Sequence, residues 1–159
     1  MSEGDDALFL SIRTGDLINP DANLFNILQE LGTDWVLQLI WGVESLDATG
    51  PEAQEFIAWV EQSSDHRLLI SGKEFLELAP KLGQTIEGVF VGYKSNDDTT
   101  EFLEGGWGAI HFADSSAELV IEIVDGTYFD LYMRSQTVSD RLTKRFEATH
   151  VADAGKFLL

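Results

Sequence analysis

The stretch Glu118–Met133 reads ELVIEIVDGTYFDLYM, and it decides the fold class of this chain. Apolar and polar residues alternate on both sides of Asp125-Gly126, with the period of two that is typical of a strand with one buried face. An Asp-Gly pair between two such runs is a strong signal for a tight hairpin turn. The sequence therefore predicts two antiparallel strands, Glu118–Val124 and Thr127–Met133.

A two-residue turn at Asp125-Gly126 also predicts the register of this hairpin. It places Ile121 opposite Asp130 and Leu119 opposite Tyr132, so that these four residues share one face of the sheet. We expect that face to be the core. Asp130 would then be either a buried carboxylate with a raised pKa or one that accepts hydrogen bonds from tyrosine and the backbone. A structural role is expected in either case, because buried polar groups normally have partners.

A third strand, Trp107–Phe112, is predicted to precede the hairpin through a short turn at Asp114-Ser115. The three strands would form an antiparallel meander over about 107–133. In this register the face opposite the core carries apolar residues together with an imidazole and two carboxylates. Its members are Trp107, Ala109, His111, Glu118, Val120, Glu122, Phe129, Leu131 and Met133.

Helix and strand signals alternate through the rest of the chain. Further strands are expected at 8–13, 35–41, 68–70 and 84–93, the last with a bulge at Gly88. Helices are expected at about 20–31, 51–60, 72–79 and 137–148. The last helix is amphipathic, with Val138, Leu142 and Phe146 on its inward face. The predicted fold class is α+β, a mixed or antiparallel sheet packed by about four helices in a single domain over 1–159.

Capping residues mark several of the expected helix starts. Asn19 is placed to cap the first helix by accepting a hydrogen bond from a free backbone amide. Ser71 and Glu74 have the spacing of a capping box, in which each side chain bonds the backbone amide of the other residue. Thr137 and Asp140 have a related spacing at the start of the last helix.

The charge of the chain is strongly unbalanced. It carries 28 Asp and Glu against 10 Lys and Arg, a formal net charge of −18 at pH 7. Residues 1–133 hold 25 of the acidic and five of the basic side chains, whereas 134–159 hold three and five. Binding to nucleic acid or to an anionic membrane needs cationic patches that replace counterions. The composition therefore argues against direct contact with either and favours a protein partner with a basic surface.

Other features of the composition exclude further classes. Ten Phe, four Trp and three Tyr can fill a core, so a disordered chain is not expected. The absence of cysteine excludes disulfides, zinc–thiolate sites and thiol nucleophiles. The acidic start does not resemble a targeting peptide, and no apolar run approaches the roughly 20 residues that span a bilayer. We expect a cytoplasmic protein without a metal or a cofactor.

One constellation could carry chemistry: Trp107, His111, Glu118 and Glu122 on the predicted second face of the meander. A carboxylate beside His111 would favour the imidazolium and could make it a proton carrier near neutral pH. The alternative is a half-exposed sheet face with a cross-strand pair worth less than ~1 kcal/mol. A single His–Glu pair without a nucleophile or metal ligands rarely marks catalysis, so the sequence favours the second interpretation.

Residues 94–106 read KSNDDTTEFLEGG and predict an acidic loop. Its carboxylates, Asp97, Asp98, Glu101 and Glu104, miss the calcium-loop spacing at the invariant Gly and at the closing Glu. A run of this kind usually means a solvated loop. Such a loop could contact a basic partner.

Two functional hypotheses follow from the sequence. The first is a non-catalytic acidic interaction protein, for example an inhibitor or immunity-type protein that occupies the cationic site of a nucleic-acid-cutting enzyme. The second is a small enzyme or small-molecule-binding protein that uses the His111/Glu118/Glu122 face. The second hypothesis needs a concave site, which distinguishes the two. The sequence leaves the partner, the ligand and the oligomeric state open.

Overall fold

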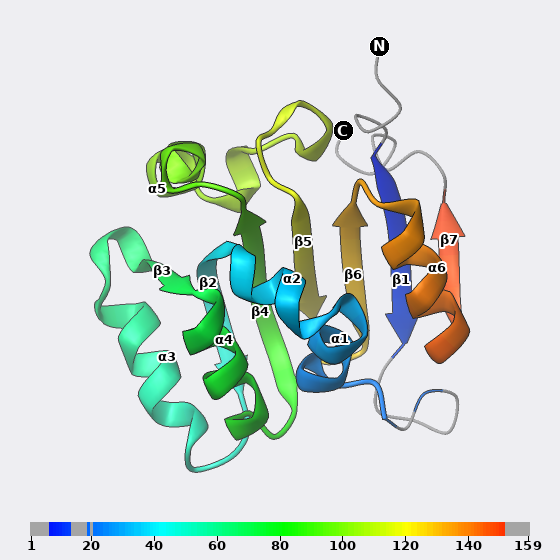
Figure 1. Ribbon diagram of the computed structural model, residues 1–159. Coiled ribbons are helices and arrows are strands. Elements are labelled where there is room, and N and C mark those ends of the chain that lie inside the picture. Colours follow the sequence, from blue (N-terminus) through cyan, green and yellow to red (C-terminus); the bar gives the residue numbers. More distant parts are fainter. Residues whose placement is uncertain (1–6, 14–18, 20, 152–159) are drawn as a thin grey trace.

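The computed structural model (Figure 1) describes residues 7–13, 19 and 21–151 of the chain. A seven-stranded sheet forms the centre of an α+β fold, with the strand order β3-β2-β4-β5-β6-β1-β7. Every neighbouring pair of these strands is antiparallel. The strands are β1 (Leu8–Arg13), β2 (Ile40–Ala48), β3 (Arg67–Ser71), β4 (Thr85–Tyr93), β5 (Leu119–Val124), β6 (Tyr128–Met133) and β7 (Ala148–Val151).

The described residues form six α-helices rather than the predicted four or so. They are α1 (Leu24–Leu31), α2 (Thr33–Gln38), α3 (Ala53–Gln62), α4 (Gly72–Leu78), α5 (Thr100–Gly105) and α6 (Gln136–Arg145). All except α5 contribute side chains to the core on one face of the sheet, while α5 packs on the opposite face. In Figure 1, α1, α2, α4 and α6 lie in front of the strands. None of the helices in the described part is long and apolar enough to cross a membrane.

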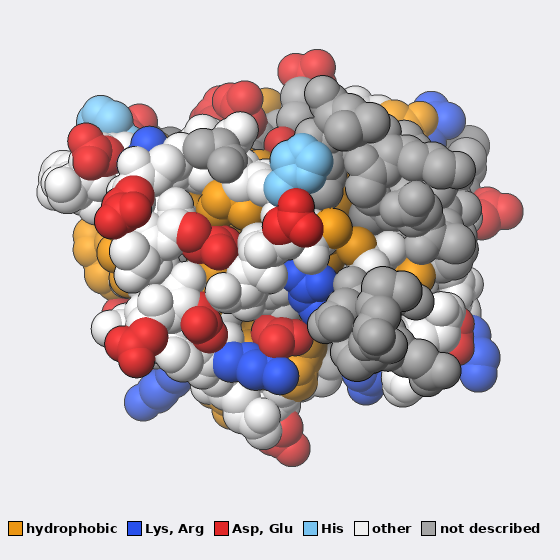
Figure 2. Space-filling view, turned by 90° about the horizontal axis from the view of Figure 1, so that it is seen from above, with side chains coloured by type: hydrophobic (Ala, Val, Ile, Leu, Met, Phe, Trp, Pro, Cys, Tyr) orange, Lys and Arg blue, Asp and Glu red, His pale blue; other side chains and the backbone are white. Residues whose placement is uncertain are grey.

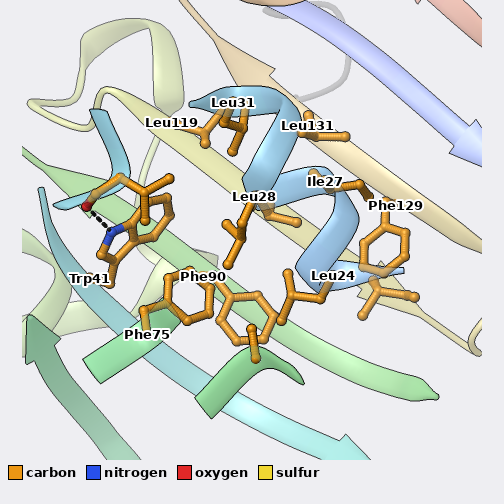
Figure 3. Close-up of a cluster of buried hydrophobic side chains, with 14 of the residues drawn as sticks. Leu24, Ile27, Leu28, Leu31, Trp41, Phe75, Phe90, Leu119, Phe129 and Leu131 are labelled. Atoms are coloured by element: carbon orange, nitrogen blue, oxygen red, sulfur yellow. Dashed lines mark hydrogen bonds between the residues drawn. The ribbon is translucent and has the colours of Figure 1, made fainter. Parts of the chain in front are cut away.

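The main core lies between the sheet and these five helices (Figure 3). Its centre is aromatic: the ring of Phe75 lies 4.8 Å from that of Trp41 and 5.1 Å from that of Phe90, between ring centroids. The indole N–H of Trp41 donates to the backbone oxygen of Val36 at 3.2 Å, which satisfies the one polar group of this buried side chain. The apolar face of α1 completes the cluster with Leu24, Ile27, Leu28 and Leu31.

The predicted hairpin forms, but its register differs from the prediction by one residue. Val124 pairs with Tyr128, so the turn has three residues instead of two. Ile121 lies opposite Leu131, and Glu122 lies opposite Asp130. Because side chains alternate between faces, this slip moves every side chain of β6 to the other side of the sheet. Phe129, Leu131 and Met133 are buried in the main core, whereas Tyr128, Asp130 and Tyr132 share the second face with Glu122.

The predicted strand Trp107–Phe112 is wrong. This segment forms two short 3₁₀ turns, Trp107–Ala109 and Phe112–Asp114. The strand that pairs with β5 is β4 instead, with Val89 opposite Glu122. Trp107 and Phe112 are buried because these turns fold back over the sheet. Their burial therefore does not come from pairing in a strand.

Two further predictions are corrected in the first half of the chain. Residues 35–38 are helical in α2, and β2 begins only at Ile40. An irregularity does fall at Gly88, but the extra residue belongs to β2: between the pairs Glu44–Val89 and Asp47–Glu87, Ser45 and Leu46 lie opposite Gly88. On its other side Gly88 pairs with Ile123 in regular register.

Helix caps also differ from the predicted ones at two positions. Asn23 caps α1 by accepting from the amide of Asn26, and Ser135 caps α6. Asn19 is buried instead, where its side-chain amide donates to the backbone oxygens of Arg13 and Glu147. It thereby joins the end of β1 to the segment before β7.

Predictions that rest on local signals are confirmed. β1 spans Leu8–Arg13, and β3 spans Arg67–Ser71. The capping box of α4 forms with both of its hydrogen bonds. The amide of Glu74 donates to the Ser71 hydroxyl, and the amide of Ser71 donates to the Glu74 carboxylate. The inward side chains predicted for the last helix, Val138, Leu142 and Phe146, are buried.

Candidate functional site

The chain between β4 and β5 folds over one end of the second sheet face. We call residues 95–117 the acidic cap. It contains the 3₁₀ turn Asn96–Thr99, the helix α5 and the two turns that replace the predicted strand. The sequence predicted residues 94–106 as a loop and 107–112 as a strand, whereas the structure folds the whole region into short helical turns that share a hydrophobic cluster with the sheet.

Three aromatic side chains fix the cap to the sheet. Phe102, Trp107 and Phe112 are exposed by only 0%, 7% and 0%. The ring of Phe102 lies directly on the backbone of β2, where a Cβ added to Gly42 would be 2.6 Å from the ring carbon Cε2. The rings of Trp107 and Phe112 pack against Tyr132 of β6 with centroid distances of 5.6 and 6.0 Å. Buried aromatic surface therefore holds the cap on the sheet, together with hydrogen bonds from Arg67 and Arg134 to its backbone oxygens.

The cap begins a long segment without positive charge. The 39 residues from Ser95 to Met133 contain nine Asp and Glu and no Lys or Arg. In Figure 2, which looks down on this end of the molecule, acidic side chains are spread over the left half of the surface. The carboxylates of this segment therefore have no Lys or Arg within it, and the basic side chains that contact it, Lys94, Arg67 and Arg134, come from its flanks and from β3.

The four acidic residues predicted in this segment have different surroundings. Asp97 and Glu104 are exposed and Asp98 is partly exposed. Asp114, which was not among the predicted site residues, is exposed in the same cap. Glu101 serves the fold instead: its carboxylate accepts from the Tyr93 hydroxyl and from the Ser116 amide, both at 3.1 Å.

A row of polar residues crosses the sheet beneath the cap. Successive pairings place Arg67 of β3 beside Glu44, Glu44 beside Val89, Val89 beside Glu122, Glu122 beside Asp130, and Asp130 beside Ser11 of β1. All these residues occupy one face, because each pair is directly opposite in the ladder. The ends of the row are closed by an Arg67 Nε–Glu44 Oε2 ion pair at 3.8 Å and a hydrogen bond from Ser11 Oγ to Asp130 Oδ1 at 2.7 Å.

Trp107 connects the cap to this row. Its backbone amide donates to Glu44 Oε1 at 2.6 Å, and its side chain makes a hydrogen bond to Glu122. Burial raises the pKa of Glu122, the charges of Asp130 and Glu44 raise it further, and the bond from Trp107 opposes the shift. Burial also raises the pKa of Asp130, against the hydrogen bond from Ser11.

Tyrosines beside the carboxylates are shifted as well. Burial, together with the charges of Glu122 and Asp130, raises the pKa of Tyr132 to about 12. Burial and the contact with Glu101 raise the pKa of Tyr93 well above its ordinary value. Both phenols stay neutral at physiological pH, and the Tyr93 hydroxyl acts as a hydrogen-bond donor to Glu101.

The structure brings together only part of the predicted His face. Trp107 and Glu122 are in contact, although through the cap and not through a shared strand pair. Glu118 instead forms an ion pair with Lys94 at 3.1 Å. His111 is exposed and lines a hollow of about 180 Å³ with Glu101 and Asp114. The proton-carrier arrangement of His111 beside Glu118 therefore has no structural basis in the observed register.

The half-buried carboxylates Glu122 and Asp130 lie opposite each other in the ladder, and the charge of Asp130 contributes to the raised pKa of Glu122. Within the described part of the chain, no group of three or more His, Asp or Glu side chains could hold a metal ion. Comparison with protein-family models, curated proteins and solved structures finds no match to this chain. Proposals about function therefore rest on two acidic features, the exposed acidic cap and the half-buried row beneath it.

Proposed function

We propose that this protein is a non-catalytic interaction protein whose acidic cap binds a partner protein with a basic surface. The observation that carries the proposal is the cap itself, a folded part of a 39-residue segment with nine carboxylates and no Lys or Arg. Inhibitors and immunity-type proteins that cover the cationic site of a nucleic-acid-cutting enzyme need a surface of this kind.

The cap is suited to binding because the backbone that carries its carboxylates is already folded. An acidic loop that is flexible before binding loses conformational entropy when it associates, and this loss weakens the complex. Phe102, Trp107 and Phe112 fix the backbone, so Asp97, Asp98, Glu104 and Asp114 project from a rigid support. Binding then requires ordering of short side chains only.

Electrostatic attraction would act before contact. Complementary potentials steer two proteins toward each other and raise the association rate by orders of magnitude at low salt. They also discourage acidic partners by repulsion. The net charge of −18 extends this effect beyond the cap, while the cap supplies the local shape.

The alternative of a small enzyme that uses His111, Glu118 and Glu122 has less support. His111 is exposed, Glu118 is paired with Lys94, and Glu122 lies beneath Trp107. The three side chains therefore do not converge on one reacting atom, as catalysis requires.

The experiment compares two variants with the same change of charge. The cap variant carries Asp97→Asn, Asp98→Asn, Glu104→Gln and Asp114→Asn. The control variant carries Glu52→Gln, Glu61→Gln, Glu77→Gln and Glu87→Gln, four exposed residues outside the cap. Each protein is immobilised and incubated with lysate of its native cells at low and at high salt, and the captured proteins are identified and quantified.

We expect the wild type and the control variant to retain the same basic protein in stoichiometric amount at low salt. The cap variant should lose it, and high salt should release it from the wild type and from the control variant. Equal loss in both variants would show that only total charge matters. Retention by the cap variant, or the absence of any stoichiometric basic protein, would refute the proposal.

A further inference from the structure

A cavity of about 530 Å³ lies at the end of the sheet where β4 and β6 finish, between α2 and the start of α6. Its wall contains Trp35, Lys94, Glu118, Arg134, Arg141 and Val138. Three of the ten Lys and Arg side chains of a strongly acidic protein therefore meet in one hollow, with a single carboxylate among them. This volume is in the range of small-molecule sites.

The positive charges are held in place by the fold. Arg134 donates to the backbone oxygens of Phe112, Ser115 and Ala117 at 2.7, 2.9 and 3.0 Å, and its guanidinium lies 4.5 Å from the centre of the Phe112 ring. Arg141 donates to the backbone oxygen of Leu31 at 3.1 Å. These hydrogen bonds to carbonyl oxygens orient the two guanidinium groups beside the cavity.

Lys94 and Glu118 form the remaining charged part of the wall. Their ion pair measures 3.1 Å, and the Lys94 side chain is 71% exposed. The charged side chains that line the cavity, three basic and one acidic, carry a net formal charge of +2. A phosphate monoester carries about −1.5 to −2 charges at pH 7. The cavity therefore matches the charge of one phosphate monoester.

The other side of the cavity is apolar and aromatic. Trp35 is half-buried, and its indole lies in the wall together with the buried Val138. An indole face offers a stacking surface for a planar ring, and bases stack on aromatic side chains with useful affinity. Ser135, Thr137 and the first turn of the ten-residue helix α6 also border the hollow, where helix amides favour an anion.

We propose that this cavity binds a small phosphate monoester that carries a planar ring, the chemistry of a nucleoside monophosphate. The phosphate lies among Arg141, Arg134 and Lys94, and the ring lies against Trp35. The net charge of the protein does not prevent this, because at physiological ionic strength charges farther away than about 8 Å are largely screened. The proposal is independent of the partner of the acidic cap.

The test uses isothermal titration calorimetry with three probes: adenosine 5′-monophosphate, adenosine and inorganic phosphate. We expect the monophosphate to bind, and adenosine and phosphate to bind at least tenfold more weakly. Lys94→Gln and Arg141→Gln should each weaken the monophosphate at least tenfold, whereas Lys144→Gln, an exposed change on the same helix as Arg141, should not. Trp35→Leu should weaken the monophosphate and leave phosphate unchanged.

A second measurement on the wild type keeps the proposal testable if a variant fails to fold. In an amide–nitrogen correlation spectrum, the monophosphate should shift the Trp35 indole signal and the amides of Gln136, Thr137 and Val138. The absence of binding by all three probes would overturn the proposal. So would equal affinity for phosphate and the monophosphate, shifts confined to other parts of the chain, or unchanged affinity in folded Lys94→Gln and Arg141→Gln variants.

Discussion

The contact between Gly42 and Phe102 decides whether the acidic cap stays folded, and Gly42→Ala tests it. A Cβ at this position would lie 2.6, 2.7 and 3.0 Å from Cε2, Cδ2 and Cζ of the Phe102 ring. The ring is fully buried and cannot move aside without displacing its neighbours. Overpacking of this kind costs about 1–3 kcal/mol. We therefore expect the free energy of unfolding to fall by that amount.

A double-mutant cycle separates this contact from other effects of the substitution. Phe102→Ala alone should cost about 3–5 kcal/mol, because it removes a large buried side chain. In that background the space beside Gly42 is open, so Gly42→Ala should become neutral or should stabilise the strand by roughly 0.5–1 kcal/mol. The coupling energy between the two sites should therefore exceed about 1 kcal/mol.

The assay is urea denaturation of the four proteins, followed by tryptophan fluorescence. Gly108→Ala serves as the control within the cap, because a Cβ there would meet nothing within 4 Å. Additive costs for Gly42→Ala and Phe102→Ala would refute the docking of Phe102 on β2. If Gly108→Ala lowered the free energy of unfolding as much as Gly42→Ala does, the effect of Gly42→Ala could not be assigned to its contact with Phe102.

Two more predictions test the faces of the sheet. Ile121 is fully buried in the main core, so Ile121→Ala should lower the free energy of unfolding by about 2–5 kcal/mol. If Ile121→Ala and Glu122→Ala had the same denaturation midpoint at the same slope, the observed faces would be contradicted. The pKa of Glu122 is raised in the folded state, so the folded protein holds this proton more tightly than the unfolded chain. Protonated Glu122 therefore contributes stability at low pH, and this contribution is lost as the pH rises through the folded-state pKa. Glu122→Gln should therefore raise the melting temperature at pH 7 and lose this gain near pH 4. The exposed Glu87→Gln is its control, and an equal gain at pH 7 would assign the effect to net charge alone.

Local signals in the sequence predicted the elements whose cause is local. The capping box of Ser71 and Glu74, the short strand before it and the hairpin around Asp125-Gly126 all form. The register of the hairpin depended on whether Thr127 belongs to the turn, and the sequence offers no local signal for that choice. One residue of difference was enough to exchange the faces of Asp130 and Leu131.

The site was harder to predict because it is built from distant parts of the chain. The row of Glu44, Glu122 and Asp130 exists only because β2, β4, β5 and β6 are neighbours in the sheet. The aromatic residues Trp107 and Phe112 have strand-like spacing, yet they are buried through turns that cover Tyr132. The acidic cap was found as a charge pattern, whereas its rigid support could not be inferred from composition.

The position of β1 in the sheet has a consequence for how the chain folds. This strand pairs Leu8 with Met133 on one side and Phe9 with Val151 on the other, so both of its partners lie more than a hundred residues away. Closing such long loops costs little more stability than closing shorter ones, because the entropy grows only with the logarithm of length. The long separation in sequence slows folding much more, since distant pairings form late. During synthesis the first strand would therefore leave the ribosome long before its partners and would remain an unpaired, apolar segment until β6 and β7 follow.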